Sequence, residues 1–162
     1  MKLKRFCWAA LFFVMLTGMA YSVDFKILSC SFRRLDGSVE VQIRFDSQLV
    51  TDVKQRLSEG ADYILRLDFE TKKGKLKRRV SLSYNPITRL YVFSIDGKEE
   101  RFRHAILLYQ RLRCLRLILD NEPVRVRAVR TDPYMPFPFN LIPGLSLHRT
   151  DWVICHGRGR EE

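Results

Sequence analysis

Apolar and polar residues alternate along most of the chain after residue 23. In the segment VEVQIRF, the apolar positions are Val39, Val41, Ile43 and Phe45. The segment YILRLDFE repeats the pattern with Tyr63, Leu65, Leu67 and Phe69, and shorter alternating segments lie within residues 76–84, 91–95 and 124–128. Strict alternation with a period of two is typical of antiparallel strands that have one face in water. We therefore expect a mainly β protein.

Pairs of turn-forming residues separate these segments. They are Asp36-Gly37, Lys73-Gly74, Asn85-Pro86 and Asp96-Gly97. Each pair predicts a tight connection between two neighbouring strands, because these residues favour the backbone conformations that turns require. About eight strands with turns at such regular spacing predict an antiparallel β-sandwich.

Two stretches have helical rather than alternating spacing. Residues 47–59, SQLVTDVKQRLSE, place Leu49, Val50, Val53 and Leu57 on one side, with Ser47 as the expected N-cap and Gly60 as the stop. In residues 101–113, RFRHAILLYQRLR, the corresponding stripe is Phe102, Ile106, Tyr109 and Leu112, widened by Leu107 and Leu108. Both predicted helices are short and amphipathic, so we expect each to cover an open edge or end of the sheets.

The first residues have the order of a secretory signal. Lys2, Lys4 and Arg5 precede an apolar run over residues 6–20, and small residues then predict cleavage before Val23. A retained N-terminal anchor is the alternative, although a run of about fifteen residues is shorter than the roughly twenty of a transmembrane helix. The predicted organisation is a signal peptide (1–22), a single β-sandwich domain (23–156) and a disordered tail (157–162).

The chain is strongly basic, with a formal net charge of +11. Residues 1–22 contain three cations and no acid, so the expected mature chain keeps a charge of +8. A charge of this size favours anionic partners, such as phospholipid headgroups or envelope polyanions. We expect no nucleic acid partner, because the chain is predicted to be exported.

The order of the segments resembles a known family. Its most specific points are LSYNPITRLYVFSIDG and the proline-rich PYMPFPFNLIPGLSLHRTDW, and the resemblance covers nearly the whole expected mature chain. It is similar to an uncharacterised family of exported bacterial proteins, the domain of unknown function forty-three-ninety. Members often begin with a signal or anchor segment and are often encoded near nitrogen-regulation-type sensor kinases, which implies export and a link to envelope signalling. The family has no established activity, so no functional residue is carried over, and Cys155-His156 depart from its usual ending.

Clustered cations give the clearest candidate site. KKGKLKRR places six of them around one predicted hairpin tip, as Lys72, Lys73, Lys75, Lys77, Arg78 and Arg79. They predict a surface that binds anions, and the alternative is a solvated turn whose lysines protect a strand edge. A second basic group contains Arg111, Arg113, Arg116, Arg125, Arg127 and Arg130.

A charge-free stretch, YMPFPFNLIPG, covers residues 134–144. Prolines at alternate positions fix an extended backbone and belong on a sheet edge. They leave Met135, Phe137 and Phe139 on one side, so we interpret the stretch as an apolar strap that closes the core. A loop that touches a membrane and a proline-rich ligand for a partner are the alternatives.

Catalytic and metal-binding patterns do not emerge from the sequence. Residues 23–162 contain Cys30, Cys114 and Cys155, so at most one disulfide forms among them and one thiol stays free. Cys30 and Cys114 are interpreted as small buried hydrophobic residues. We expect Asp62, Asp68 and Glu70 to pair with neighbouring Lys and Arg. Cys155 and His156 should point opposite ways on a strand.

These observations predict a non-enzymatic binding or interaction module at the periplasmic face of the inner membrane, with no cofactor and no metal. Its expected partner is a membrane protein or an anionic lipid surface. The alternative is a carrier of a small amphipathic ligand or lipid, and an enzyme is the third possibility. A filled core with cations gathered on one face would favour the interaction module, whereas an accessible apolar cavity would favour the carrier.

Overall fold

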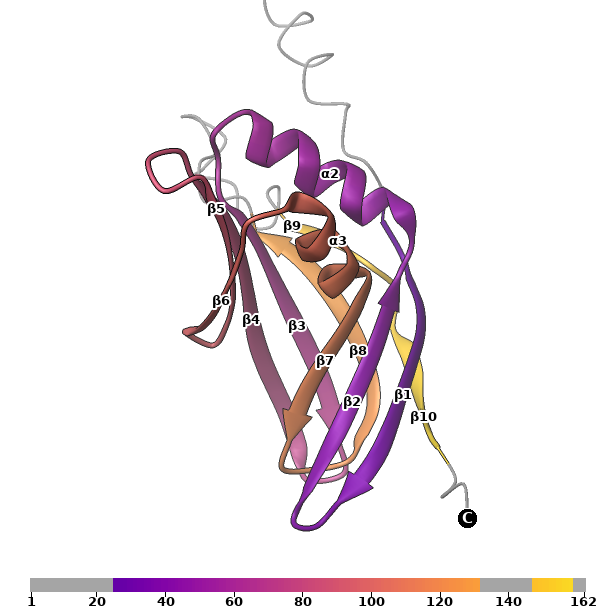
Figure 1. The fold of residues 1–162 in the computed structure, drawn as a ribbon. Helices are drawn as coiled ribbons and strands as arrows, with labels where there is room; N and C mark the ends of the chain where they lie inside the picture. The colour runs from indigo at the N-terminus through magenta and orange to yellow at the C-terminus, as the bar shows by residue number, and fades with distance from the viewer. Residues whose placement is uncertain (1–24, 132–146, 159–162) are drawn as a thin grey trace, which may run out of the picture.

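Strands dominate the part of the chain that the computed structural model describes, residues 25–131 and 147–158 (Figure 1). The strands are β1 (Ile27–Leu35), β2 (Ser38–Phe45), β3 (Tyr63–Thr71), β4 (Gly74–Asn85), β5 (Leu90–Ile95), β6 (Lys98–Phe102), β7 (Cys114–Leu119), β8 (Pro123–Thr131), β9 (Leu147–Arg149) and β10 (Val153–Gly157). The helices are α2 (Ser47–Ser58) and α3 (Ala105–Arg113). The mainly β content, the two helices and the predicted turns are confirmed.

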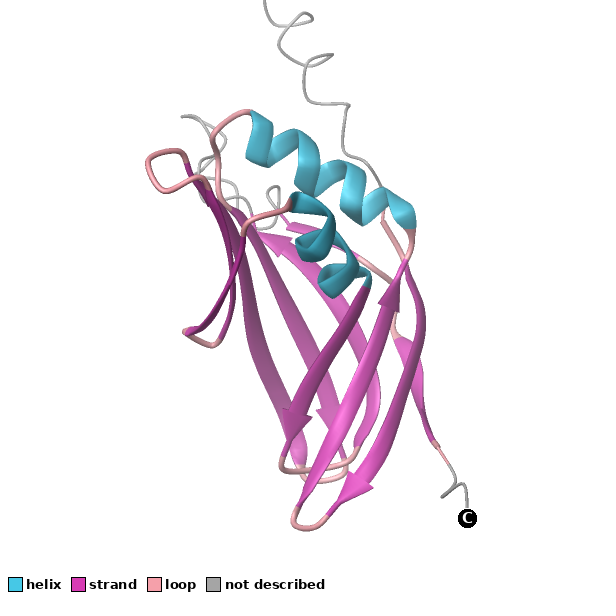
Figure 2. Ribbon diagram, in the orientation of Figure 1, coloured by secondary structure: helices cyan, strands magenta, loops and turns pink. Residues whose placement is uncertain are grey.

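The strands form one curled sheet, a half-barrel, rather than the predicted sandwich (Figure 2). Among the described residues, nine strands follow one another in the order β6-β5-β4-β3-β8-β10-β1-β2-β7, and β9 also pairs with β8. Both helices lie at one end of the half-barrel (Figure 1).

Strand β10 joins two halves of the sheet into one, the half β6-β5-β4-β3-β8 and the half β1-β2-β7. It pairs in parallel with β1, where Cys30 is opposite Cys155, and antiparallel with β8, where Val153 is opposite Val126. One strand therefore hydrogen-bonds to both halves, which in a sandwich would face each other as separate sheets. This strand also continues to Gly157, one residue beyond the predicted end of the domain. Arg158 is held as well, because its backbone N–H donates to the carbonyl of Phe32 at 2.7 Å.

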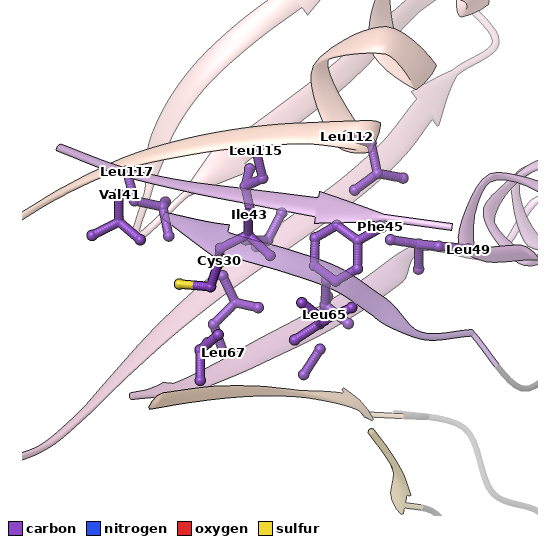
Figure 3. Packing of buried hydrophobic residues seen from close by; sticks show 14 of the residues in the cluster. Cys30, Val41, Ile43, Phe45, Leu49, Leu65, Leu67, Leu112, Leu115 and Leu117 are labelled. Carbon is purple, nitrogen blue, oxygen red and sulfur yellow. The ribbon is translucent and has the colours of Figure 1, made fainter. Parts of the chain in front are cut away.

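The hydrophobic core fills the concave side of the sheet (Figure 3). The alternating positions of β2 and β3 supply much of it, as predicted, and Val41, Ile43, Leu65 and Leu67 have no exposed surface. Side chains of β7 and of both helices complete the cluster, with Leu49 and Leu112 among them. The helices therefore cover the concave side, where an unpaired sheet face would otherwise expose apolar side chains.

Helix α2 agrees with the prediction from the sequence except at its N-cap. The N-cap is Asp46 rather than the predicted Ser47, and its Oδ1 accepts a hydrogen bond from the N–H of Leu49 at 3.3 Å. The other oxygen of Asp46 accepts from the N–H of Lys26 at 3.0 Å, so this carboxylate also fixes the start of β1. The predicted stop is confirmed, because Gly60 has a φ of +75° that favours glycine.

Helix α3 begins later than predicted and buries only part of the predicted stripe. Phe102 belongs to β6, so the helix starts only at Ala105. Its buried residues are Leu108 and Leu112, whereas Ile106, which was predicted to face the core, is 63% exposed. The spacing from Phe102 to Ile106 is therefore not a helical repeat, because a strand end and a turn separate the two residues.

Cys30 and Cys155 form a disulfide between β1 and β10, with Cα atoms 4.5 Å apart. The prediction of a single disulfide and a free thiol is confirmed for the described cysteines, since Cys114 is unpaired. The interpretation of Cys30 as only a small buried hydrophobic residue was wrong. Its partner comes from the far end of the chain, 125 residues away, which local alternation does not reveal.

Candidate functional site: a cationic sheet face

Cationic side chains gather on the convex face of four neighbouring strands. Residues opposite each other in a ladder share a face of the sheet. The outward-pointing residues of β3 are Arg66, Asp68 and Glu70, and each lies between a residue of β4 and a residue of β8 that point the same way. We call the following set the cationic face: Arg66, Lys75, Lys77, Arg79, Arg125, Arg127 and Arg149. Among the residues that the structure describes, seven cations share this face with two carboxylates, Asp68 and Glu70, which leaves five positive charges in excess.

Both carboxylates of this face are already engaged by arginines. Asp68 is buried and accepts hydrogen bonds from Nε of Arg66 at 2.8 Å and from Nε of Arg127 at 3.1 Å. Glu70 accepts a hydrogen bond from Nε of Arg125. The prediction that Asp68 and Glu70 pair with neighbouring cations is confirmed. These acids orient the guanidinium groups, and no ion pair engages Lys75, Lys77, Arg79 or Arg149 within the described ranges.

Trp152 lies on the same face beside two of these arginines. The guanidinium carbon of Arg125 is 4.8 Å from its ring centroid, and that of Arg127 is 4.7 Å away. Cation–π contacts of this kind hold a charged group close to an aromatic ring. Ile154, which pairs with Arg125 in the ladder, is 63% exposed. The cationic face therefore ends in an aromatic and an aliphatic side chain along β10.

The structure divides the predicted six-residue cluster. Lys75, Lys77 and Arg79 point outward onto the cationic face, whereas Arg78 has the opposite orientation and donates to Asp96 at 2.9 Å. Lys72 lies at the hairpin tip and donates from Nζ to Glu122 at 3.0 Å. Lys73 is exposed at the same tip.

The second predicted basic group is also divided. Arg125 and Arg127 join the cationic face, but Arg130 points inward and holds the buried carboxylate of Asp52 with contacts of 2.9 and 3.0 Å. Tyr63 donates its hydroxyl to the same carboxylate at 2.7 Å. Arg111 lies away from this face and binds Glu100. The Asp52 cluster fastens α2 to β3 and β8, and its burial fits a structural role.

Glu122, in the connection between β7 and β8, joins this connection to the tips of two hairpins at the end of the half-barrel opposite the helices. It accepts from Arg34 at the end of β1 and from Lys72 between β3 and β4. Hydrogen bonds from Arg34, and then from Lys72, hold the pKa of this carboxyl below its usual range, and the same contact raises the pKa of Arg34.

Other predicted features have mixed outcomes. Cys155 is buried and His156 exposed, so the expected opposite orientation is confirmed. Within the described ranges, no group of three His, Cys, Asp or Glu side chains could hold a metal ion. The apolar strap residues Met135, Phe137 and Phe139, like the predicted signal at 1–22, lie outside the described residues. No helix in residues 25–131 or 147–158 is long and apolar enough to span a membrane.

Sequence reasoning missed Arg66, Arg149 and Trp152 as parts of one surface. The signal for Arg66 was present, because it shares the outward parity of Asp68 and Glu70 in YILRLDFE. The signal for Trp152 was not, since its neighbours Arg125 and Arg127 come from a strand that is distant in sequence.

Comparisons with protein-family models, with curated proteins and with solved structures find no match.

Proposed function

We propose that this chain is an exported, non-enzymatic interaction module of the bacterial envelope, whose cationic face binds an anionic lipid surface. The observation that carries this proposal is the excess of five positive charges on one convex sheet face, where both carboxylates are already bound by arginines. Export rests on the N-terminal sequence pattern. The resemblance to the uncharacterised exported family stays a prediction.

A lipid surface fits this face better than a soluble anion would. The cations are spread along four strands instead of converging on one pocket, which suits a broad charged surface. Trp152 and the exposed Ile154 lie at its border, and such side chains favour the interface between headgroups and acyl chains. The carrier alternative has less support, because the apolar side chains of the concave side are packed into one buried cluster.

Sedimentation with vesicles tests the proposal. The mature chain should bind vesicles that contain phosphatidylglycerol and should not bind purely zwitterionic vesicles. Basic residues near an anionic membrane contribute about 1 kcal/mol each, so a Lys75→Gln/Lys77→Gln/Arg79→Gln variant should bind about a hundredfold more weakly. A matched Lys54→Gln/Arg103→Gln/Arg113→Gln variant removes three exposed cations from the helix end and should retain most of the binding.

Two outcomes would contradict the proposal. One is equal binding of both vesicle types, since the charge of the face would then be irrelevant. The other is an equal loss in both triple variants, because net charge rather than the cationic face would then explain the binding. A soluble polyanion that binds while anionic vesicles do not would assign the face to that polyanion instead.

A further inference from the structure

The two edge strands of the curled sheet differ in how well they resist pairing with another strand. Strand β6 has the sequence KEERF, with four charged residues in succession, whereas β7 has the sequence CLRLIL, with one. Charged side chains along an edge oppose the addition of a further strand. Within the described part of the chain, β7 pairs with β2 alone. Its outer edge is therefore open and lacks the charged residues that protect β6.

A surface groove runs beside this edge. It encloses about 370 Å³ between β7 and the β5–β6 hairpin. On one wall lie Arg116, Leu117 and Ile118, and on the other lie Ile95 and Lys98. Ile118 is 55% exposed although it belongs to a regular strand. The groove thus places exposed apolar surface directly along an unpaired strand edge.

Arg111 of α3 holds the two walls in position. Its Nε and Nη2 donate to the two carboxylate oxygens of Glu100 in β6, each at 3.1 Å. The same Nη2 donates to the backbone carbonyl of Arg116 in β7 at 3.4 Å. One side chain therefore links both edge strands, and the groove is formed before any partner arrives.

The charges of the groove favour an acidic occupant. Its lining contains three acids, Asp96, Glu99 and Glu100, and each already accepts a hydrogen bond from an arginine. Lys98 and Arg116 also line the groove, and neither has an ion pair within residues 25–131 and 147–158. Two cations therefore face the groove without a carboxylate partner.

We propose that this groove accepts an extended acidic segment of a partner protein, which adds as a strand to the open edge of β7. The added strand would hydrogen-bond to the β7 backbone, as in other cases of strand addition. Because side chains alternate along a strand, apolar residues of the segment would contact Leu117 and Ile95, and acidic residues would lie near Arg116. A second copy fits less well, since it would bring the unpaired cations of two strongly basic chains together.

A pair of synthetic peptides of about ten residues tests this proposal, one alternating valine with glutamate and the other valine with lysine. The mature protein should bind the glutamate peptide at least about tenfold more tightly in fluorescence anisotropy. Hydrogen exchange should then slow at the amides of residues 114–119 and stay unchanged at 98–102. No binding of the glutamate peptide, or equal binding of both peptides, would overturn the proposal.

Three variants assign the site. Ile118 lies on the same exposed face of β7 as Arg116, so Ile118→Glu places a negative charge where the glutamates of the peptide would lie and should abolish the binding. Ile87→Glu makes the same change at a residue that is 91% exposed in the β4–β5 turn, and should leave the binding intact. Arg116→Glu should reverse the preference between the two peptides. Unaltered binding by Ile118→Glu would overturn the proposal, and so would a dimer in analytical ultracentrifugation that this variant dissolves.

Discussion

Cys30 and Cys155 lie directly opposite each other in β1 and β10 and form a disulfide across this parallel pair of strands. The bond closes a loop with a sequence separation of 125 residues. A crosslink over so long a loop restricts the unfolded chain strongly, and native disulfides typically contribute about 2–5 kcal/mol. We therefore expect a Cys30→Ala/Cys155→Ala variant to lose about that much free energy of unfolding in urea titrations. Cys114→Ala is the control and should change it by less than about 1 kcal/mol.

The buried pair between Asp52 and Arg130 predicts a second stability effect. Asp52→Ala removes the carboxylate that accepts from Arg130 and Tyr63 within the core. Breaking a buried ion pair from one side costs about 3–5 kcal/mol, because the other charge stays buried. Asp62→Ala, at an exposed position just before β3, should stay within about 0.5 kcal/mol of the parent. Equal melting temperatures for the two variants would show that the pair contributes no stability.

Trp152 provides an optical test of the cationic face. The expected mature chain contains no other tryptophan, because Trp8 lies in the predicted signal. If the face meets lipid, the indole moves into a less polar environment, so anionic vesicles should shift its emission to shorter wavelengths. Raising the salt concentration should reverse the shift, because the Debye length falls from about 10 Å at 0.1 M to about 3 Å at 1 M. An emission maximum that ignores the vesicles would contradict lipid contact at this face.

Glu122 predicts a pH dependence with a definite sign. The pKa of Glu122 is lowered by Arg34 and then by Lys72. The ionised carboxylate is therefore more stable in the folded protein than in the unfolded chain. The resulting stability is complete above the ordinary carboxyl pKa and is lost as the pH falls through the lowered value. Glu122→Gln should therefore reduce the melting temperature at pH 7 and make little difference in strong acid. A difference that grows on acidification would contradict this assignment.

The sequence predicted local structure well and long-range pairing poorly. The alternation of Val39, Val41 and Ile43 is enough to place them in the core, because a strand with one face in water buries its apolar face. The half-barrel was not predictable in this way, because it depends on the pairing of β10 with both β1 and β8. No local pattern encodes that pairing.

In the candidate site, the orientation of some side chains was predictable from the sequence and that of others was not. Arg78 has the same parity as the buried Val80 in the alternating segment 76–84, so its separation from Lys77 and Arg79 could have been predicted from alternation alone. The stack of Trp152 on Arg125 and Arg127 could not, because it depends on β8 and the start of β10 lying side by side. The open edge of β7 likewise follows only from the strand order.

The position of β10 also determines when the fold can close. It is the last of the described strands along the chain, yet it lies between β1, the first, and β8. Until residues 153–157 are available, the hairpin of β1 and β2 and the meander from β3 to β6 have no strand that joins them. Contacts between such distant residues slow folding, because a large loop must close before they contribute. The chain should thus fold after synthesis of this strand rather than progressively from its N-terminus, a delay that would suit the export proposed above.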